Sequence, residues 1–129
     1  MTITPSERAM KWSKENYDRT RIFNIYNQAR IRAKRQGVPF TITTKWFLNK
    51  ALTGGKCEVT GLPFDHSTPT VKRKMNPFSA SLDRVIPELG YTPDNCRVVC
   101  WIHNRAKGSD GMNDLYTYCR AFVRAIEGE

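Results

Sequence analysis

The chain has 129 residues, which is enough for one compact domain with its own hydrophobic core. A hydrophobic content of 40%, with three Trp, six Phe and five Tyr, excludes an intrinsically disordered chain. The 21 Lys and Arg residues outnumber the 12 Asp and Glu, and the formal charge of +9 favours a polyanionic partner, most commonly nucleic acid. The alternative is a basic surface that only keeps the protein soluble.

The N-terminal residues give no sign of secretion. The stretch MTITPSERAMKWSK lacks the apolar segment of a signal peptide, and no run is long enough to span a bilayer. We therefore expect a cytoplasmic protein with no membrane partner. In that compartment the four cysteines are thiols or metal ligands rather than disulfides.

The first predicted element is a basic helix. We expect residues 1–15 to form a flexible arm and residues 17–36 a helix, which Gly37 ends. Apolar residues recur along it at intervals of three and four and form one stripe: Ile22, Ile25, Tyr26, Ala29 and Ala33. Its other faces carry cations and almost no acid: Arg19, Arg21, Arg30, Arg32, Lys34 and Arg35. Such a helix either contacts phosphates or presents a solvated face.

Shorter elements follow the basic helix. Residues 43–52 suggest a helix capped by Thr43 or Thr44, and its apolar residues are expected in the core: Trp46, Phe47 and Leu52. The stretch CEVTGLPF, residues 57–64, predicts a strand that ends at a Gly-Leu-Pro turn. Residues 65–80 read as an exposed loop with a basic run at 72–74.

A strand, a loop, a second strand and a helix are predicted over residues 81–108. The apolar residues at 82–86 and 97–100 indicate strands, and residues 87–95 between them are rich in turn-formers. Residues 101–107 have helical character, and Gly108 suits the helix end. Asp83 lies near the end of the first strand, and a polar cluster lies at the start of the helix. We therefore expect the two to meet at one point.

The C-terminal residues predict an amphipathic helix. Its apolar residues recur at helical spacing, and we expect them to cover the core: Leu115, Tyr118, Cys119, Phe122, Val123 and Ile126. Cys96 is also expected in the core, because a free cysteine packs as a small apolar group.

Four motifs occur in order along the chain: CEVTGLPF, SLDR, GYTPDN and CWIHNRAKG. Together they resemble the HNH endonuclease superfamily, the ββα-metal nucleases, in its phage-type variant. The preceding IYNQARIRAKRQGVPFTIT is similar to the basic helix that often leads into this variant. The resemblance covers roughly residues 20–110. It implies an α+β fold in one nuclease domain of residues 16–129, in which the basic helix and the C-terminal helix flank a ββα core at about 81–108.

The resemblance also implies a metal site. Asp83 matches the family's acidic metal ligand, and Asn104 matches the last ligand, which is usually a His or Asn on the helix. We prefer Asn104 to His103 because it lies four residues after Cys100, the family's usual offset. Asn95 matches a central Asn that ties down the loop with its side-chain amide. The alternatives are a surface ion pair for Asp83 and a helix cap for Asn104.

Arg84 departs from the family pattern, which usually has a catalytic His after the aspartate. Arginine stays protonated and cannot accept a proton from water, but it can hold the scissile phosphate with two donors. The base must then come from elsewhere. A metal-bound water could lose its proton directly, or His66, His103 or Tyr91 could take part.

Many HNH domains bind a structural zinc through two Cys-x-x-Cys knuckles, and both are altered here. Thr60 replaces the second Cys of the first knuckle and His103 that of the second. Cys57, Cys100 and His103 remain, and His66 would complete a tetrahedral Zn²⁺ site. The alternative, buried apolar thiols and an exposed His, is the interpretation we prefer.

The sequence and the resemblance together predict a DNA endonuclease that needs Mg²⁺ or Mn²⁺, in the host-cell cytoplasm if a phage encodes it. Double-stranded DNA is the expected partner, and the protein is a monomer or a homodimer. The predicted DNA contacts are Arg30, Arg32 and Arg35, with Arg105 and Lys107 beside backbone phosphates. The alternatives are a DNA-binding module that keeps the fold without the base, and an RNA-directed protein with the same basic surface.

Overall fold

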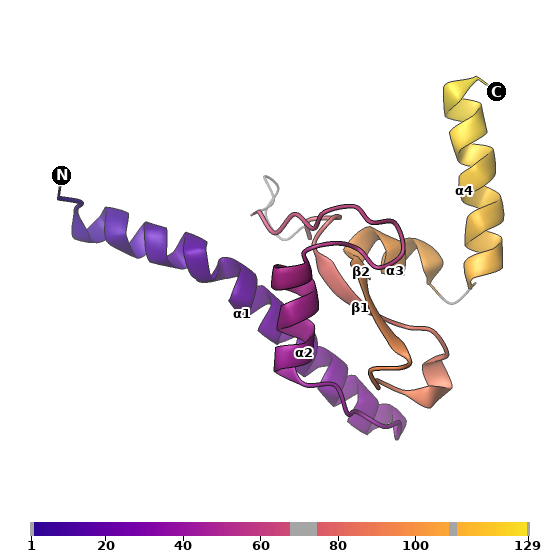
Figure 1. Cartoon of the computed structure of the whole chain (residues 1–129), viewed down its shortest axis with the longest axis horizontal. Helices are drawn as coiled ribbons and strands as arrows, with labels where there is room; N and C mark the ends of the chain where they lie inside the picture. Colours follow the sequence, from indigo (N-terminus) through magenta and orange to yellow (C-terminus); the bar gives the residue numbers. More distant parts are fainter. Residues whose placement is uncertain (1, 68–74, 109–110, 129) are drawn as a thin grey trace.

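The computed structural model describes residues 2–67, 75–108 and 111–128, and for residues 9–18 only the backbone. The predicted basic run at 72–74 lies outside the described residues. A long helix, a shorter helix, a two-stranded antiparallel sheet and two further helices follow one another along the chain (Figure 1). The predicted α+β class is therefore confirmed.

Helix α1 (Pro5–Gln36) begins twelve residues before the predicted start at Tyr17. Thr4 and Glu7 form a capping box, in which Glu7 N donates to Thr4 Oγ1 at 3.1 Å and Thr4 N donates to Glu7 Oε2 at 2.8 Å. With Pro5 at the first helical position, these bonds stabilise a helix start. Residues 5–15, which were predicted to belong to a flexible arm, are therefore part of the helix. Gly37 ends the helix in the left-handed conformation, as predicted.

The apolar stripe of α1 forms the core with the next helix and the sheet. Ile22, Ala29 and Ala33 are buried, and Phe47 of α2 (Thr44–Leu48) is fully buried against Ile22. Thr43 caps α2 by accepting from Trp46 N at 3.1 Å. A π-helical segment, η1 (Asn49–Gly54), continues α2. The predicted stripe and the predicted capped helix are both confirmed.

Residues 57–64 form a tight turn instead of the predicted strand. Cys57 N donates to Leu62 O at 2.8 Å, and Gly61 N donates back to Cys57 O at 2.8 Å. Gly61 has a φ of 74°, which L side chains rarely adopt. Within the described residues of this stretch, strand pairing is limited to one bridge between Lys56 and Pro63, and Glu58 N donates to Val98 O at 2.9 Å. The backbone hydrogen bonds of Cys57 therefore stabilise a turn here instead of the extended backbone of a strand.

Strands β1 (Ala80–Arg84) and β2 (Cys96–Cys100) pair in antiparallel fashion, so that Asp83 lies opposite Arg97. The loop between them contains a 3-10 turn, η2 (Pro87–Leu89), and helix α3 (Trp101–Lys107) follows β2 directly. Side chains alternate between the two faces of a strand. Leu82 and Val98 therefore pack toward α1 and α2, whereas Ser81 and Asp83 face α3.

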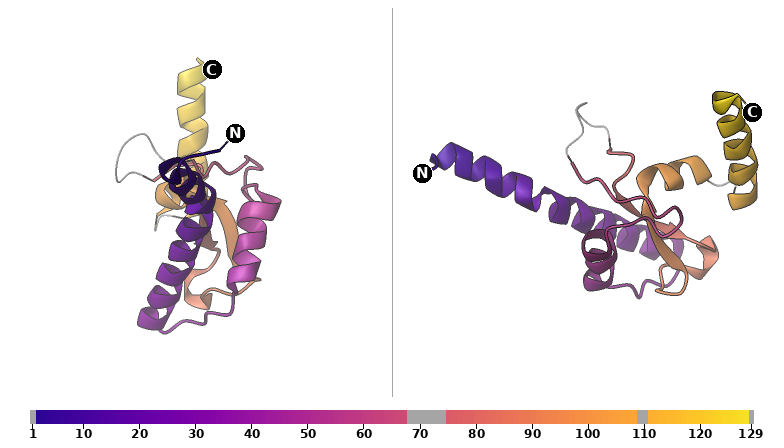
Figure 2. Two further views of the ribbon diagram at one scale, coloured as in Figure 1. Left: turned by 90° about the vertical axis from the view of Figure 1, so that its left-hand side faces the viewer. Right: turned by 45° about the horizontal axis from the view of Figure 1, so that its top comes forward.

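Helix α4 (Met112–Glu127) projects away from the rest of the molecule (Figures 1 and 2). Its predicted apolar residues are largely exposed, with Ile126 at 71% and Tyr118 at 68%, and Cys119 is exposed too. The amphipathic helix is present, but the expectation that it covers the core was wrong. The periodicity shows which face is apolar and does not show what packs on it. Cys96, by contrast, is buried as expected.

In the described part of the chain, none of the helices combines the length and the apolar character that crossing a bilayer requires.

Candidate functional site

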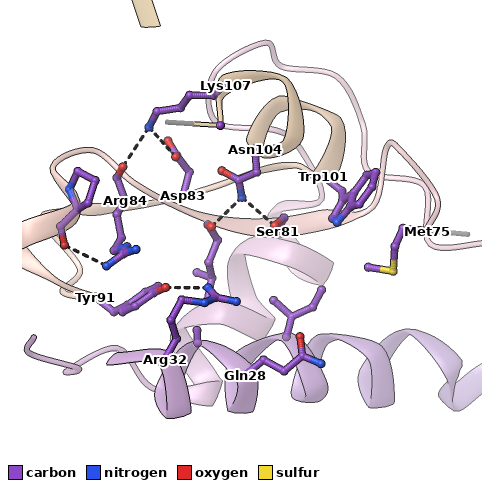
Figure 3. Close-up of a pocket in the computed structure, with 15 residues that line it drawn as sticks. Gln28, Arg32, Met75, Ser81, Asp83, Arg84, Tyr91, Trp101, Asn104 and Lys107 are labelled. Atoms are coloured by element: carbon purple, nitrogen blue, oxygen red, sulfur yellow. Dashed lines mark hydrogen bonds and ion pairs between the residues drawn. The ribbon is translucent and has the colours of Figure 1, made fainter. Parts of the chain in front are cut away.

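A cavity of about 330 Å³ lies along the edge of β1 that faces α1, with α3 on its other side (Figure 3). The polar and aromatic side chains that line it come from α1, β1, the loop after β1 and α3. They are Gln28, Arg32, Ser81, Asp83, Arg84, Tyr91, Trp101, Asn104 and Lys107. Three of these carry a positive charge and one a negative charge, so the cavity favours an anionic ligand.

Asp83 is buried, with 4% of the residue exposed, and each carboxylate oxygen accepts from a cation. Arg97 donates to Oδ2 at 2.9 Å from the opposite position on β2. Lys107 donates to Oδ1 at 2.7 Å from the last turn of α3, and also to the carbonyl of Arg84 at 3.1 Å. The ion pairs fix the carboxylate at the cavity wall and leave one net positive charge around it.

Asn104, on α3, connects this helix to β1 at the wall of the cavity. Its Nδ2 donates to Ser81 Oγ at 2.8 Å and to Leu82 O at 2.7 Å, a carbonyl on the edge of β1 that β2 does not pair. Figure 3 shows the other end of this amide on the side of Asp83. The two residues proposed as metal ligands therefore line the same cavity, although they come from different elements.

The oxygens of Asp83 and Asn104 suit Mg²⁺, which usually takes one or two protein ligands and completes its shell with water and phosphate. The Lys107 ammonium already contacts the same carboxylate. A cation at Asp83 would therefore have to replace Lys107, whose flexible side chain allows it to move.

Arg84 lines the cavity and is held in place from several directions. Its NH1 donates to Gln36 Oε1 at 2.9 Å and to Pro87 O at 3.0 Å. Its guanidinium carbon lies 4.7 Å from the centre of the Tyr91 ring. An arginine has five N–H donors, so the contacts at NH1 leave those of NH2 and Nε for a ligand.

Tyr91 connects two of the cavity's arginines. The residue is 1% exposed, and its hydroxyl accepts from Arg32 NH1 at 2.9 Å while Arg84 stacks on its ring. Its backbone N–H also bonds Pro39 O at 2.8 Å. These contacts make Tyr91 a rigid support rather than an accessible acid or base.

Asn95 ties down the loop between the strands, as the resemblance implied. Its Nδ2 donates to Ile86 O at 2.8 Å and to Gly90 O at 2.7 Å, and its Oδ1 accepts from Ile86 N at 3.0 Å. The loop places Pro87 and Tyr91, which hold Arg84. Asn95 therefore acts on the cavity through the loop and does not line it.

His103 lies beside Asp83, with Nε2 at 3.9 Å from Oδ2, and its side chain is 9% exposed. Among the described residues Nε2 has no hydrogen-bond partner. Burial lowers the pKa of His103, the positive charges of Arg97 and Lys107 lower it further, and Asp83 partly opposes them. The imidazole is therefore neutral at neutral pH. His66, another candidate base, accepts from Ala80 N at 3.3 Å instead.

The four residues considered for zinc do not gather at one point. Cys100 N donates to Cys57 Sγ at 3.5 Å, and His66 accepts from Ala80, the strand partner of Cys100, whereas His103 lies at Asp83. Burial raises the pKa of the Cys100 thiol to about 11. Over the residues that the structure describes, no group of three or more His, Cys, Asp or Glu side chains could hold a metal ion. These residues do not fit a structural zinc as arranged.

The predicted DNA-contacting residues separate into two sets. Arg32 and Lys107 line the cavity, whereas Arg30 and Arg35 are exposed elsewhere on α1. Arg105 is exposed and lies over the Trp101 ring at 5.1 Å.

Sequence reasoning missed Arg97, Gln28 and Ser81 at or beside the cavity. Only Arg97 left a usable signal, because pairing the two predicted strands as a hairpin places it across from Asp83.

In comparisons with known proteins, no family model matches the chain, and no curated protein and no solved structure gives a significant match.

Proposed function

We propose that the protein is a metal-dependent endonuclease of the HNH type that hydrolyses phosphodiester bonds in double-stranded DNA. The observation that carries this proposal is the meeting of Asp83 and Asn104 in a cavity that also presents Arg32, Arg84 and Lys107. A carboxylate and an amide oxygen suit a divalent cation, and the three cations suit a phosphate. The succession of β1, a loop, β2 and α3 also agrees with the ββα core that the sequence resemblance implies.

Arg84 would hold the scissile phosphate. Its contacts with Gln36, Pro87 and Tyr91 fix the guanidinium before a ligand arrives, so little side-chain freedom is lost on binding. The donors that remain can bind two phosphate oxygens and stabilise the charge that develops on them in the transition state. Arg32, which Tyr91 holds, would bind the same or the next phosphate.

Asp83 and Asn104 would hold Mg²⁺ or Mn²⁺. When bound, the ion would supply Lewis-acid charge that polarises the phosphodiester and stabilises the leaving oxygen. Lys107 would then leave Asp83 and become available to a DNA phosphate. His103 and His66 do not line the cavity, and the Tyr91 hydroxyl is bonded to Arg32, so we assign the proton-accepting role to none of the three.

The first test is incubation of the purified protein with supercoiled plasmid, with Mg²⁺ or with EDTA. We expect conversion to the nicked form with Mg²⁺ and none with EDTA. Plasmid that stays supercoiled under both conditions would contradict the proposal.

A second candidate is a DNA-binding module that keeps the fold without catalysis. The observation in its favour is that Arg97 and Lys107 already neutralise Asp83, as in a structural ion pair. This candidate predicts DNA binding that Mg²⁺ does not change and no nicking by the same preparation.

A further inference from the structure

A second hollow continues the candidate site along α1. This cavity of about 320 Å³ is lined by Thr20, Arg21, Asn24, Ile25, Gln28 and Met75. Ile25, Gln28 and Met75 also line the cavity that contains Asp83. The two cavities therefore adjoin at these shared residues, and we call the pair the α1 groove.

The polar side chains that α1 contributes to the groove lie on one face of the helix. Arg21, Asn24, Gln28 and Arg32 follow one another at intervals of three and four residues, the spacing of neighbours on a helix surface. Figure 3 shows Gln28 and Arg32 side by side on α1, below the strand that carries Ser81 and Asp83. From Arg21 to Arg32 the helix rises about 16 Å, which corresponds to about five base-pair steps of DNA.

The cations at the ends of this row are held, whereas the amides between them are exposed. Arg21 NH1 donates to Met75 Sδ at 3.0 Å, NH2 bonds Ser79 Oγ, and Arg32 NH1 bonds Tyr91. Asn24 and Gln28 are exposed, and within the described part of the chain no hydrogen bond uses their side chains. Two unpaired amides between two anchored arginines form a binding surface for a ligand that has both charge and polar edges.

We infer that the α1 groove binds the DNA that flanks the scissile phosphate, and that Asn24 and Gln28 read its base edges. Asn and Gln amides match the donor and acceptor pair on an adenine edge, whereas phosphate contacts carry no sequence information. Arg21 and Arg32 would set the register by contacting phosphates at the two ends of the row. This inference rests on the proposed nuclease function, because that function places the scissile phosphate at Asp83.

The test is cleavage of a randomised pool of DNA duplexes, with sequencing of the ends that are produced. The wild type should prefer particular bases within about five positions on one side of the cut. The double variant N24A/Q28A should lose about tenfold or more of that preference and still cut the disfavoured sequences. Both changes place a good helix former on an exposed helix face, so α1 should remain folded. The control is Asn49→Ala, which removes an exposed amide from η1, a segment that does not line the groove, and should leave the preference unchanged.

The outcomes test the groove inference and the nuclease proposal separately. A cut with no flanking preference, or a preference that N24A/Q28A keeps, would overturn the groove inference while nuclease activity stands. If the wild type does not cut, the proposed function fails, and the same pool is then selected for binding. Sequence enrichment that the double variant loses would support base reading along α1, and the absence of enrichment would overturn it.

Discussion

Lys107 Nζ lies 2.7 Å from Oδ1 of Asp83, so the carboxylate proposed to bind a divalent cation already has a protein cation as its partner. The two positive charges compete for one carboxylate, because like charges this close repel each other. Lys107 should therefore lower the affinity of the site for a metal ion. A DNA phosphate that binds the ammonium would remove this competition.

Removing this competitor should strengthen metal binding. We expect Lys107→Gln to lower the Mg²⁺ concentration required for half-maximal nicking by several-fold, and to weaken DNA binding because one phosphate contact is lost. The measurement is a Mg²⁺ titration of nicking at saturating DNA. Lys45→Gln, an exposed lysine on α2, is the matched control and should leave the titration unchanged. An unchanged Mg²⁺ requirement in Lys107→Gln would show that the two cations do not share Asp83.

Arg84 should act as a phosphate clamp. We expect Arg84→Lys to keep part of the nicking rate, because a point charge still reaches the phosphate, and Arg84→Ala to lose about 10²-fold or more. Arg84→His should help little if another residue is the base. Gln36→Ala removes the contact of 2.9 Å that orients Arg84 and should reduce the rate less than Arg84→Ala. The measurement is single-turnover nicking, and full activity in Arg84→Ala would rule out the clamp.

Asn95 should be important for stability. Replacing it by Ala leaves three backbone groups without their partners, at Ile86 N, Ile86 O and Gly90 O. Each lost hydrogen bond costs about 1 kcal/mol or more when the group stays buried, and less at the exposed Ile86, so we expect a loss of about 2 kcal/mol in the free energy of unfolding. Urea unfolding measures the loss. The exposed Asn113 of α4 is the control, and Asn113→Ala should change the value by less than about 0.5 kcal/mol. A similarly small change in Asn95→Ala would contradict the role of the amide.

The buried thiol of Cys96 should make the protein less stable at alkaline pH. Burial raises the pKa of its thiol from the ordinary value of 9.0 to about 11. The unfolded chain therefore releases this proton first, and the stabilising contribution of the thiol is complete below pH 9 and disappears between pH 9 and pH 11. We expect Cys96→Ala to be less stable than the wild type at pH 8. Between pH 9 and pH 11, its free energy of unfolding should fall by on the order of 2 kcal/mol less than that of the wild type. Parallel losses in both proteins would contradict the assignment.

The local signals of the sequence predicted much of the fold. The spacing of Ile22, Ala29 and Ala33 identified the buried face of α1, and the turn-formers between the two strands identified the loop. Residues 4–7 also contain a capping box, Thr-Pro-Ser-Glu, that would have placed the start of α1 correctly.

The rest depends on contacts that a linear pattern does not contain. The turn at 57–64 is set by the backbone hydrogen bonds that join Cys57 to Leu62 and to Gly61, although its residues also suit a strand. The apolar face of α4 is exposed because the helix projects away from the core, in a direction that periodicity does not specify. At the site, motif positions identified Asp83 and Asn104, but the pairing of Asp83 with Lys107 and the position of Gln28 follow only from the packing of α1 and α3 around β1.

Asp83 tests the central proposal most directly, through nicking and DNA binding measured on the same preparations. We expect Asp83→Asn, which keeps the size of the side chain, to abolish Mg²⁺-dependent nicking of supercoiled plasmid. DNA affinity should stay within a few-fold of the wild type, because the cations of the cavity remain. Thermal unfolding of the variant confirms that the domain is folded, since Arg97 and Lys107 lose their charged partner. A folded Asp83→Asn protein that nicks the plasmid as fast as the wild type would contradict the assignment of Asp83 to a catalytic metal site.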